Sequence, residues 1–175
     1  FCLDGDAEGA QQAGAEFSVM GYPTVVVLRA DRTEVARIAG GLDLGSYADV
    51  LDFALEAVNP LPELLQSLRV NASLALSQAD CRRMAYNAWR LDPRADADAA
   101  ALVESLQLAE QRCPRDAIAE RDRLTAMAAS LAASAELEDV KTGRAPSTRL
   151  RALMASVQAL VADRERSIRV VDKLI

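Results

Sequence analysis

The first 40 residues combine short apolar runs with turn residues, which predicts strands around one helix. Residues 7–17 place their small and apolar side chains near one helical face. Residues 25–28 form a continuous β-branched run, typical of a buried central strand. Residues 34–39 alternate polar and apolar side chains, as a half-buried strand does. The turn residues at 30–33 make the two runs a candidate β-hairpin, and residues 1–4 read as the end of an earlier strand.

The pattern changes after residue 58. Residues 46–58 repeat apolar side chains at helical spacing behind Ser46, a plausible N-cap. Asn59-Pro60-Leu61-Pro62 then marks a domain boundary. Beyond it we find no convincing strand. Helices are expected over residues 62–70, 77–91, 96–112, 115–138 and 147–174, with Ser77 and Ser147 as N-caps and antiparallel neighbours.

These patterns predict two units. Residues 1–59 are expected to form an α/β unit in the order strand, helix, strand, strand, helix, and residues 60–175 an all-α helical domain. The apolar share of 51% is enough to bury a core, and the low aromatic share of 4% favours helix over a β-sandwich. No apolar run approaches the roughly 18 residues that a membrane-spanning helix needs.

Charge is distributed unevenly along the chain. The net charge is −6, and the first 60 residues hold ten acids against three arginines, which leaves about +1 for the rest. An acidic front half argues against nucleic-acid binding there.

Histidine is absent from the chain, which excludes histidine-based triads and the commonest metal ligand. The three cysteines lie far apart and form no Cys-x-x-Cys, so we expect neither a metal site nor a cofactor.

Gly21-Tyr22-Pro23-Thr24 stands directly before the β-branched run, and Gly40-Gly41 follows the next strand. In this order, residues 1–58 resemble the thioredoxin-like family from its third strand to its last helix. The resemblance implies that Pro23 follows a cis peptide bond and that Gly21, Tyr22, Pro23 and Thr24 form a substrate-binding loop, where the backbone of Tyr22 pairs with an extended polypeptide. The alternative is that Pro23 only shapes the turn before a buried strand.

The reactive cysteine pair of that family has no counterpart in this sequence. By the resemblance the pair belongs upstream of Phe1, so we interpret the chain as a truncated or processed product. Cys2 falls on a strand and is expected to be a small buried side chain. The resemblance implies a fragment of a thiol–disulfide oxidoreductase, inactive by itself, which acts on an extended polypeptide or a redox protein. The alternative is a non-catalytic protein-interaction module with a helical partner-binding domain.

Cys81 and Cys113 stand near the start of one predicted helix and at the end of the next. In an antiparallel pair these positions meet, so a disulfide is one interpretation, and two independent buried thiols are the other. A disulfide favours an oxidising compartment such as the periplasm, whereas free thiols leave the cytoplasm open.

Two further features concern packing. Met84, Tyr86 and Trp89 are expected in the core rather than in a ligand cage. The basic last segment carries an apolar stripe that either packs on its own domain or binds a partner; its residues are Leu150, Leu153, Met154, Val157, Leu160 and Val161.

The strand at residues 25–28 would have an exposed edge if its neighbours are missing. We expect a C-terminal helix to cover it or the chain to form a homodimer.

Overall fold

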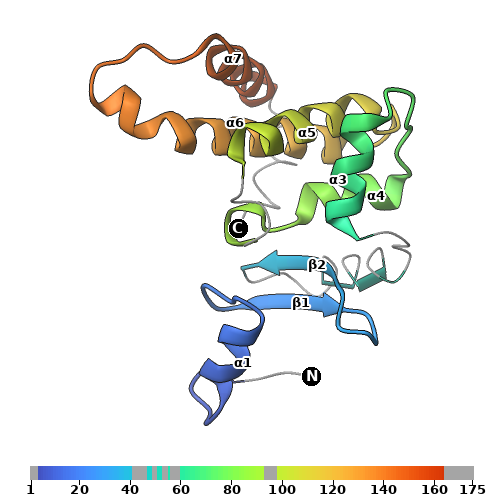
Figure 1. Cartoon of the computed structure of the whole chain (residues 1–175). Helices are drawn as coiled ribbons and strands as arrows, with labels where there is room; N and C mark the ends of the chain where they lie inside the picture. Colours follow the sequence, from blue (N-terminus) through green and yellow to red (C-terminus); the bar gives the residue numbers. More distant parts are fainter. Residues whose placement is uncertain are drawn as a thin grey trace.

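The computed structural model describes residues 4–40, 47–48, 51–52, 55, 60–92 and 98–163. In these ranges the chain is mostly helical, with one antiparallel hairpin between α1 and the helices α3–α7 (Figure 1). The elements in chain order are α1 Ala10–Glu16, β1 Thr24–Leu28, β2 Glu34–Ala39, α3 Leu61–Val70, α4 Gln78–Tyr86, a 3₁₀ turn Trp89–Leu91, α5 Ala99–Arg112, α6 Ile118–Lys141 and α7 Thr148–Ala162.

The predicted hairpin is confirmed. β1 pairs with β2 in antiparallel register from Thr24 opposite Ala39 to Leu28 opposite Glu34, with an irregularity after Val27. In the turn, the Asp31 carboxylate accepts a hydrogen bond from the Thr33 amide, 2.9 Å away. This bond and one from the Thr33 side chain lower the pKa of Asp31 below its usual value.

The expected thioredoxin-like α/β unit is wrong. The sheet of the described residues has two strands, both in the hairpin, and lacks the strand–helix–strand pattern of that fold. The first predicted strand covered residues 1–4, of which Asp4 alone is described. Its carboxylate accepts from the Asp6 amide and its carbonyl from the Ala7 amide. These local bonds satisfy polar groups that a strand would pair with a neighbour.

β1 also differs from the buried central strand that its β-branched run predicts. All five of its residues are half-buried, and its one partner among the described strands is β2. A continuous apolar run cannot by itself distinguish a central strand from one side of a hairpin. The helix expected over residues 46–58 lies largely outside the described residues.

Local sequence explains the helix ends. The Ser77 hydroxyl accepts from the Asp80 amide at α4, and the Ser147 hydroxyl accepts from the Leu150 amide at α7. Both predicted N-caps are therefore confirmed. The 59/60 domain boundary stays a prediction. α3 begins one residue after Pro60 and carries a second proline in its first turn, where proline is tolerated.

The helix predicted over residues 77–91 breaks at Asn87. The Asn87 backbone is extended, and α4 ends at Tyr86 before the 3₁₀ turn. The Asn87 amide oxygen accepts from the Arg37 amide (3.1 Å), and the Ala88 amide donates to the Arg37 carbonyl (2.7 Å). This segment therefore pairs with β2 in place of continuing the helix.

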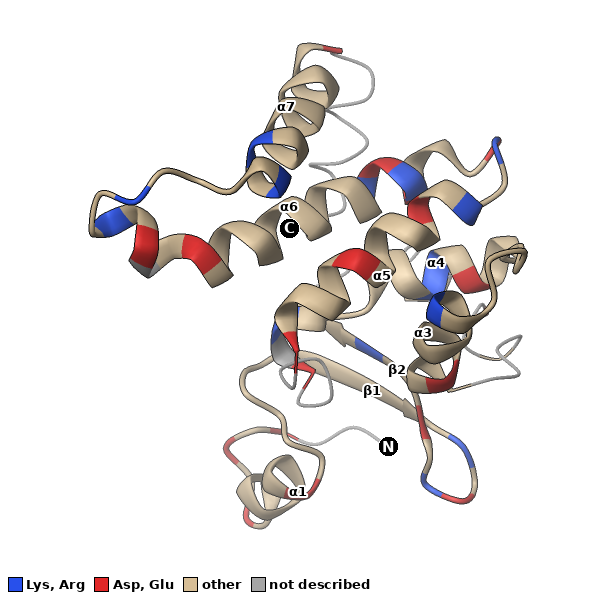
Figure 2. Cartoon of the chain, turned by 45° about the horizontal axis from the view of Figure 1, so that its top comes forward, with Lys and Arg blue, Asp and Glu red and all other residues tan. Residues whose placement is uncertain are grey.

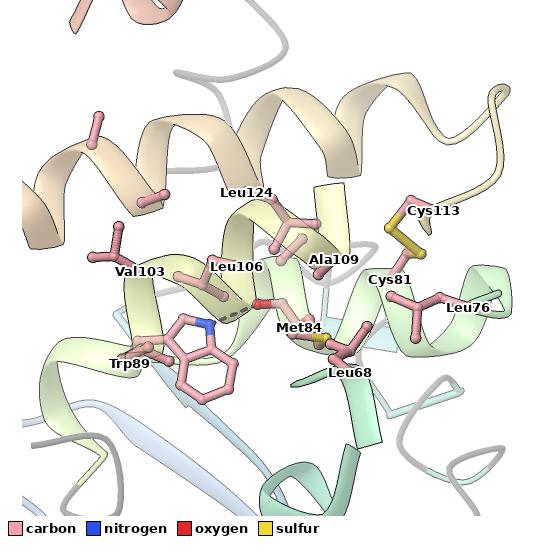
Figure 3. Packing of buried hydrophobic residues seen from close by; sticks show 14 of the residues in the cluster. Leu68, Leu76, Cys81, Met84, Trp89, Val103, Leu106, Ala109, Cys113 and Leu124 are labelled. Atoms are coloured by element: carbon pink, nitrogen blue, oxygen red, sulfur yellow. Dashed lines mark hydrogen bonds between the residues drawn. A yellow bond between two sulfur atoms is a disulfide. The ribbon is translucent and has the colours of Figure 1, made fainter. Parts of the chain in front are cut away.

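The main core lies among α3–α7 (Figure 3). Trp89 and Met84 are buried there, as predicted, and the Trp89 indole donates to the Met84 carbonyl at 2.8 Å. Tyr86 is half-buried beneath the Arg123 guanidinium, 4.6 Å from the ring centre. The largest buried apolar side chains of this core are Leu61, Leu68, Met84, Trp89, Val103, Leu106 and Leu124.

Candidate functional site

The predicted binding loop joins α1 to β1 and lies on the surface. The Tyr22–Pro23 bond is cis, as the resemblance implies. Tyr22 is 63% exposed, and Met20 beside it is 76% exposed. The Thr24 hydroxyl donates to the Gly21 carbonyl and closes the loop. The loop therefore offers two apolar side chains and open backbone to solvent.

Two glycines make room for the Tyr22 ring. A Cβ atom at Gly5 would stand 3.2 Å from Cε2 of Tyr22, and one at Gly14 would stand 3.3 Å from its hydroxyl. The structure shows that both let Tyr22 lie against the segment around α1.

β1 continues directly from this loop and has a backbone edge that faces away from β2. The Gly40 amide donates to the Pro23 carbonyl, and the Arg29 amide donates to the Thr33 carbonyl. Because successive residues of an antiparallel strand alternate between its two edges, Thr24, Val26 and Leu28 direct their amides and carbonyls to the outer edge. Among the described residues, no strand pairs with that edge.

Neither covering expected for this edge appears in the described ranges. Figure 1 shows β2 between β1 and the helices α3–α7, with α1 on the other side of β1; α4 packs on the hairpin through β2. The homodimer stays a prediction, because a single chain does not test it.

Arg37 fixes the loop to the rest of the molecule. Its side chain is 1% exposed and forms a two-pronged ion pair with the Glu34 carboxylate, at 3.0 and 2.9 Å. The guanidinium also donates to the carbonyls of Phe17 (2.5 Å) and Ser18 (3.1 Å), just before the loop. These bonds satisfy a charge that would be costly to bury without partners.

The sequence pattern missed Arg37. Residues two apart in a strand share a face, so Arg37 lies on the same face as Val35 and Ala39, and a charged residue in a half-buried strand is ordinarily expected to be exposed. Residues 35–38 of β2 are all buried, and the Arg37 guanidinium reaches the Phe17 and Ser18 carbonyls just after α1. A long-range carbonyl partner leaves no local sequence signal, so the pattern alone could not identify this residue.

Cys81 and Cys113 form a disulfide between the first turns of α4 and the C-cap of α5. Their Cα atoms lie 5.8 Å apart, and both residues are buried (Figure 3). Two buried, bonded sulfurs offer no thiolate to a substrate. Cys2 lies outside the described residues.

The described ranges contain no group of three or more metal-ligating side chains placed to hold an ion. Within the same ranges, no helix combines the length and apolar character that crossing a membrane requires.

No protein-family model, curated protein or solved structure matches this chain.

Proposed function

We propose that this chain binds an extended segment of another polypeptide along the outer edge of β1, next to the loop of residues 20–24. The observation that carries the proposal is the position of that edge. It begins where the exposed loop ends, and no described strand pairs with it.

The chemistry of the edge suits an added strand. Thr24, Val26 and Leu28 offer backbone donors and acceptors, which supply the affinity when a peptide joins a sheet. β1 contains no charged residue and no proline, two devices with which proteins block an exposed edge. Met20 and Tyr22 stand beside the start of the strand and would contact side chains of the bound segment.

Arg37 supports this function as a positioning residue. It holds the Phe17 and Ser18 carbonyls and belongs to β2, so it keeps the loop and the strand edge in one fixed arrangement. A preformed edge loses less conformational entropy when a peptide binds.

A second candidate function is thiol–disulfide exchange by a longer protein that contains this chain. The bound segment would then be the substrate, and a cysteine pair upstream of Phe1 would react with it. The exposed Gly21-Tyr22-Pro23-Thr24 loop between α1 and β1 supports this candidate, because it stands where the sequence resemblance places a substrate-facing loop.

The binding proposal is tested with a fluorescein-labelled peptide of alternating threonine and valine. The control peptide has the same sequence with every second amide N-methylated, which removes donors and blocks strand pairing. We expect the methylated peptide to bind at least about tenfold more weakly, since each backbone hydrogen bond contributes about 0.5–1.5 kcal/mol. Equal affinities, measured by fluorescence anisotropy, would show that strand pairing is not the mode of binding.

An insulin-reduction assay distinguishes the two candidate functions. The chain alone should show no turnover above the background of dithiothreitol. Binding of the threonine–valine peptide without turnover supports the interaction module. Turnover by a longer form that carries an upstream Cys-x-x-Cys, lost when both of those cysteines are changed to serine, would establish the oxidoreductase.

A further inference from the structure

The side chains of β1 determine which kind of segment its outer edge can accept. All five residues from Thr24 to Leu28 are half-buried, and none of them is charged. A strand of an antiparallel sheet commonly alternates, with apolar side chains on the covered face and polar ones toward solvent. β1 departs from this alternation, because four of its five side chains are aliphatic and they occupy both faces.

The two faces of β1 lie against different parts of the hairpin. Val25 and Val27 pack against the smaller buried cluster, which belongs to β2. Val26 lies on the other face, opposite Arg37. A strand paired with the outer edge would place a side chain beside each of these valines, with Cβ atoms about 4.5–5.5 Å apart. Both faces of the added strand would therefore contact β-branched side chains.

The charged residues of β2 already have partners. The Arg37 guanidinium donates to the Glu34 carboxylate and to two backbone carbonyls. The Arg37 side chain is 1% exposed and that of Glu34 is 15% exposed. A lysine or glutamate beside Val26 would therefore lose hydration without gaining an ionic partner.

Charged residues lie near the two ends of the edge. Asp4 and Asp6 flank Gly5, which lies against the Tyr22 ring, and Arg29 directly follows β1. Figure 2 shows β1 uncharged along its length, with charged residues around α1 and in the turn after the strand. A bound segment can therefore carry charges at its ends, but the stretch beside β1 meets apolar side chains.

We infer that the outer edge of β1 accepts an uncharged segment with apolar, mostly β-branched side chains at successive positions, so that both faces of the segment are apolar. This inference rests on the function proposed above and names the chemistry of the bound segment. Such a segment differs from an amphipathic strand, in which every second residue is charged or strongly polar. Cross-strand pairs of β-branched side chains stabilise a sheet, which favours this composition beside β1.

The test uses the full chain and labelled nine-residue peptides based on alternating threonine and valine. In two variants, the fourth and sixth residues are both lysine or both glutamate. These two residues share a face, and a slip of one residue turns them to the other face of the sheet. The peptide can therefore choose the face for its charges, but a five-residue stretch of it always contains at least one of them.

We expect both charged peptides to bind at least about tenfold more weakly than the parent at physiological ionic strength, because neither face offers a partner to the charges. The matched controls carry the same charges at the first and ninth residues, outside the stretch beside β1. These controls should bind within about threefold of the parent peptide.

A substitution in β1 checks the position of the bound segment. Val26→Glu should bind the lysine peptide at least about threefold more tightly than the glutamate peptide, since opposite charges on neighbouring strands attract. Val70→Glu, at an exposed position of α3, should bind the two charged peptides alike. Circular dichroism establishes whether Val26→Glu folds; if it does not, the peptide comparison with the unaltered chain decides.

Charged peptides that bind within twofold of the parent, while N-methylation still weakens the parent, would overturn this inference and leave strand addition in place. A penalty for only one sign of charge would attribute the preference to electrostatic attraction and would also overturn it. Loss of the N-methylation effect would contradict the function proposed above, and this inference with it.

Discussion

At the scale of single residues, Arg37 makes long-range contacts that no local sequence pattern predicts. Its backbone joins β2 to Asn87 and Ala88. Its side chain bonds the Glu34 carboxylate and the Phe17 and Ser18 carbonyls, just before the loop of residues 20–24. Arg37 thus connects three parts of the molecule: its backbone joins the hairpin to the segment after α4, and its guanidinium joins the hairpin to the loop. A buried charge of this kind stabilises the fold only while all of its hydrogen-bonding and ionic partners are present.

We predict that Arg37→Met lowers the free energy of unfolding by about 3–5 kcal/mol, because it removes the bonds that the buried guanidinium donates to the Glu34 carboxylate and to the Phe17 and Ser18 carbonyls. Arg32→Met is the matched control in the same hairpin. Arg32 pairs with Glu16 on the surface, where both side chains are more than half exposed, and its loss should cost at most about 1 kcal/mol. Urea denaturation measures both. Equal effects of the two substitutions would contradict the role given to Arg37.

At the scale of elements, a carboxylate of α6 is bonded to the residue that caps α7. Glu136 accepts from the Ser147 hydroxyl and the Ser147 amide, which lowers its pKa below the usual 4.5. The same hydroxyl accepts from the Leu150 amide and caps α7. The carboxylate thereby orients the residue that begins the helix.

A lowered pKa means that the charged form of Glu136 favours the folded connection. This stabilisation of the folded connection is present above about pH 4.5, and it is lost as the pH falls through the lowered pKa that Glu136 has in the folded protein. We predict that amide-exchange protection at Ser147 and Leu150 decreases in this acidic window. Glu136→Gln should remove that pH step, whereas Glu8→Gln, beside α1, should leave it unchanged. A step that persists in Glu136→Gln would assign the effect to another group.

The Cys81–Cys113 disulfide is a second stabilising contact between elements. It closes a separation of 32 residues between α4 and α5, for which chain entropy predicts a stabilisation of about 3–4 kcal/mol. We predict that the Cys81→Ala/Cys113→Ala variant loses about this much in urea denaturation, whereas Cys2→Ser loses little. Thiol titration of the unfolded, unreduced protein should find about one free thiol. Three free thiols in protein made in an oxidising compartment would exclude the bridge.

The sequence predicted the helices and strands better than the long-range contacts around them. The hairpin and both serine caps follow from contacts within a few residues, and the pattern found them. The break at Asn87 follows from bonds to Arg37, fifty residues away, and the pattern missed it. The β-branched run of β1 predicted a central strand. Such a run indicates that a strand can be buried, but it does not indicate how many strands lie beside it. The cis bond before Pro23 was predicted and is present, the substrate-binding role of residues 21–24 stays a prediction, and the thioredoxin-like fold expected around them is wrong.

At the scale of the whole molecule, the described residues form two buried clusters. The main cluster lies among α3–α7, and a smaller one lies on β2 with Val25 and Val27 of β1 packed against it. α4 contacts β2, and β1 lies on the side of β2 away from α3–α7 (Figure 1). A segment added at the outer edge of β1 would therefore leave the main cluster unchanged.

The most direct test of the central claim is backbone amide exchange, followed by NMR, with and without the threonine–valine peptide. If an extended segment joins the outer edge of β1, the amides of Thr24, Val26 and Leu28 gain protection when the peptide is added. Those of Val25 and Val27, which face β2, are protected already and change little. Peptide binding that leaves Thr24, Val26 and Leu28 unprotected would contradict strand addition at this edge.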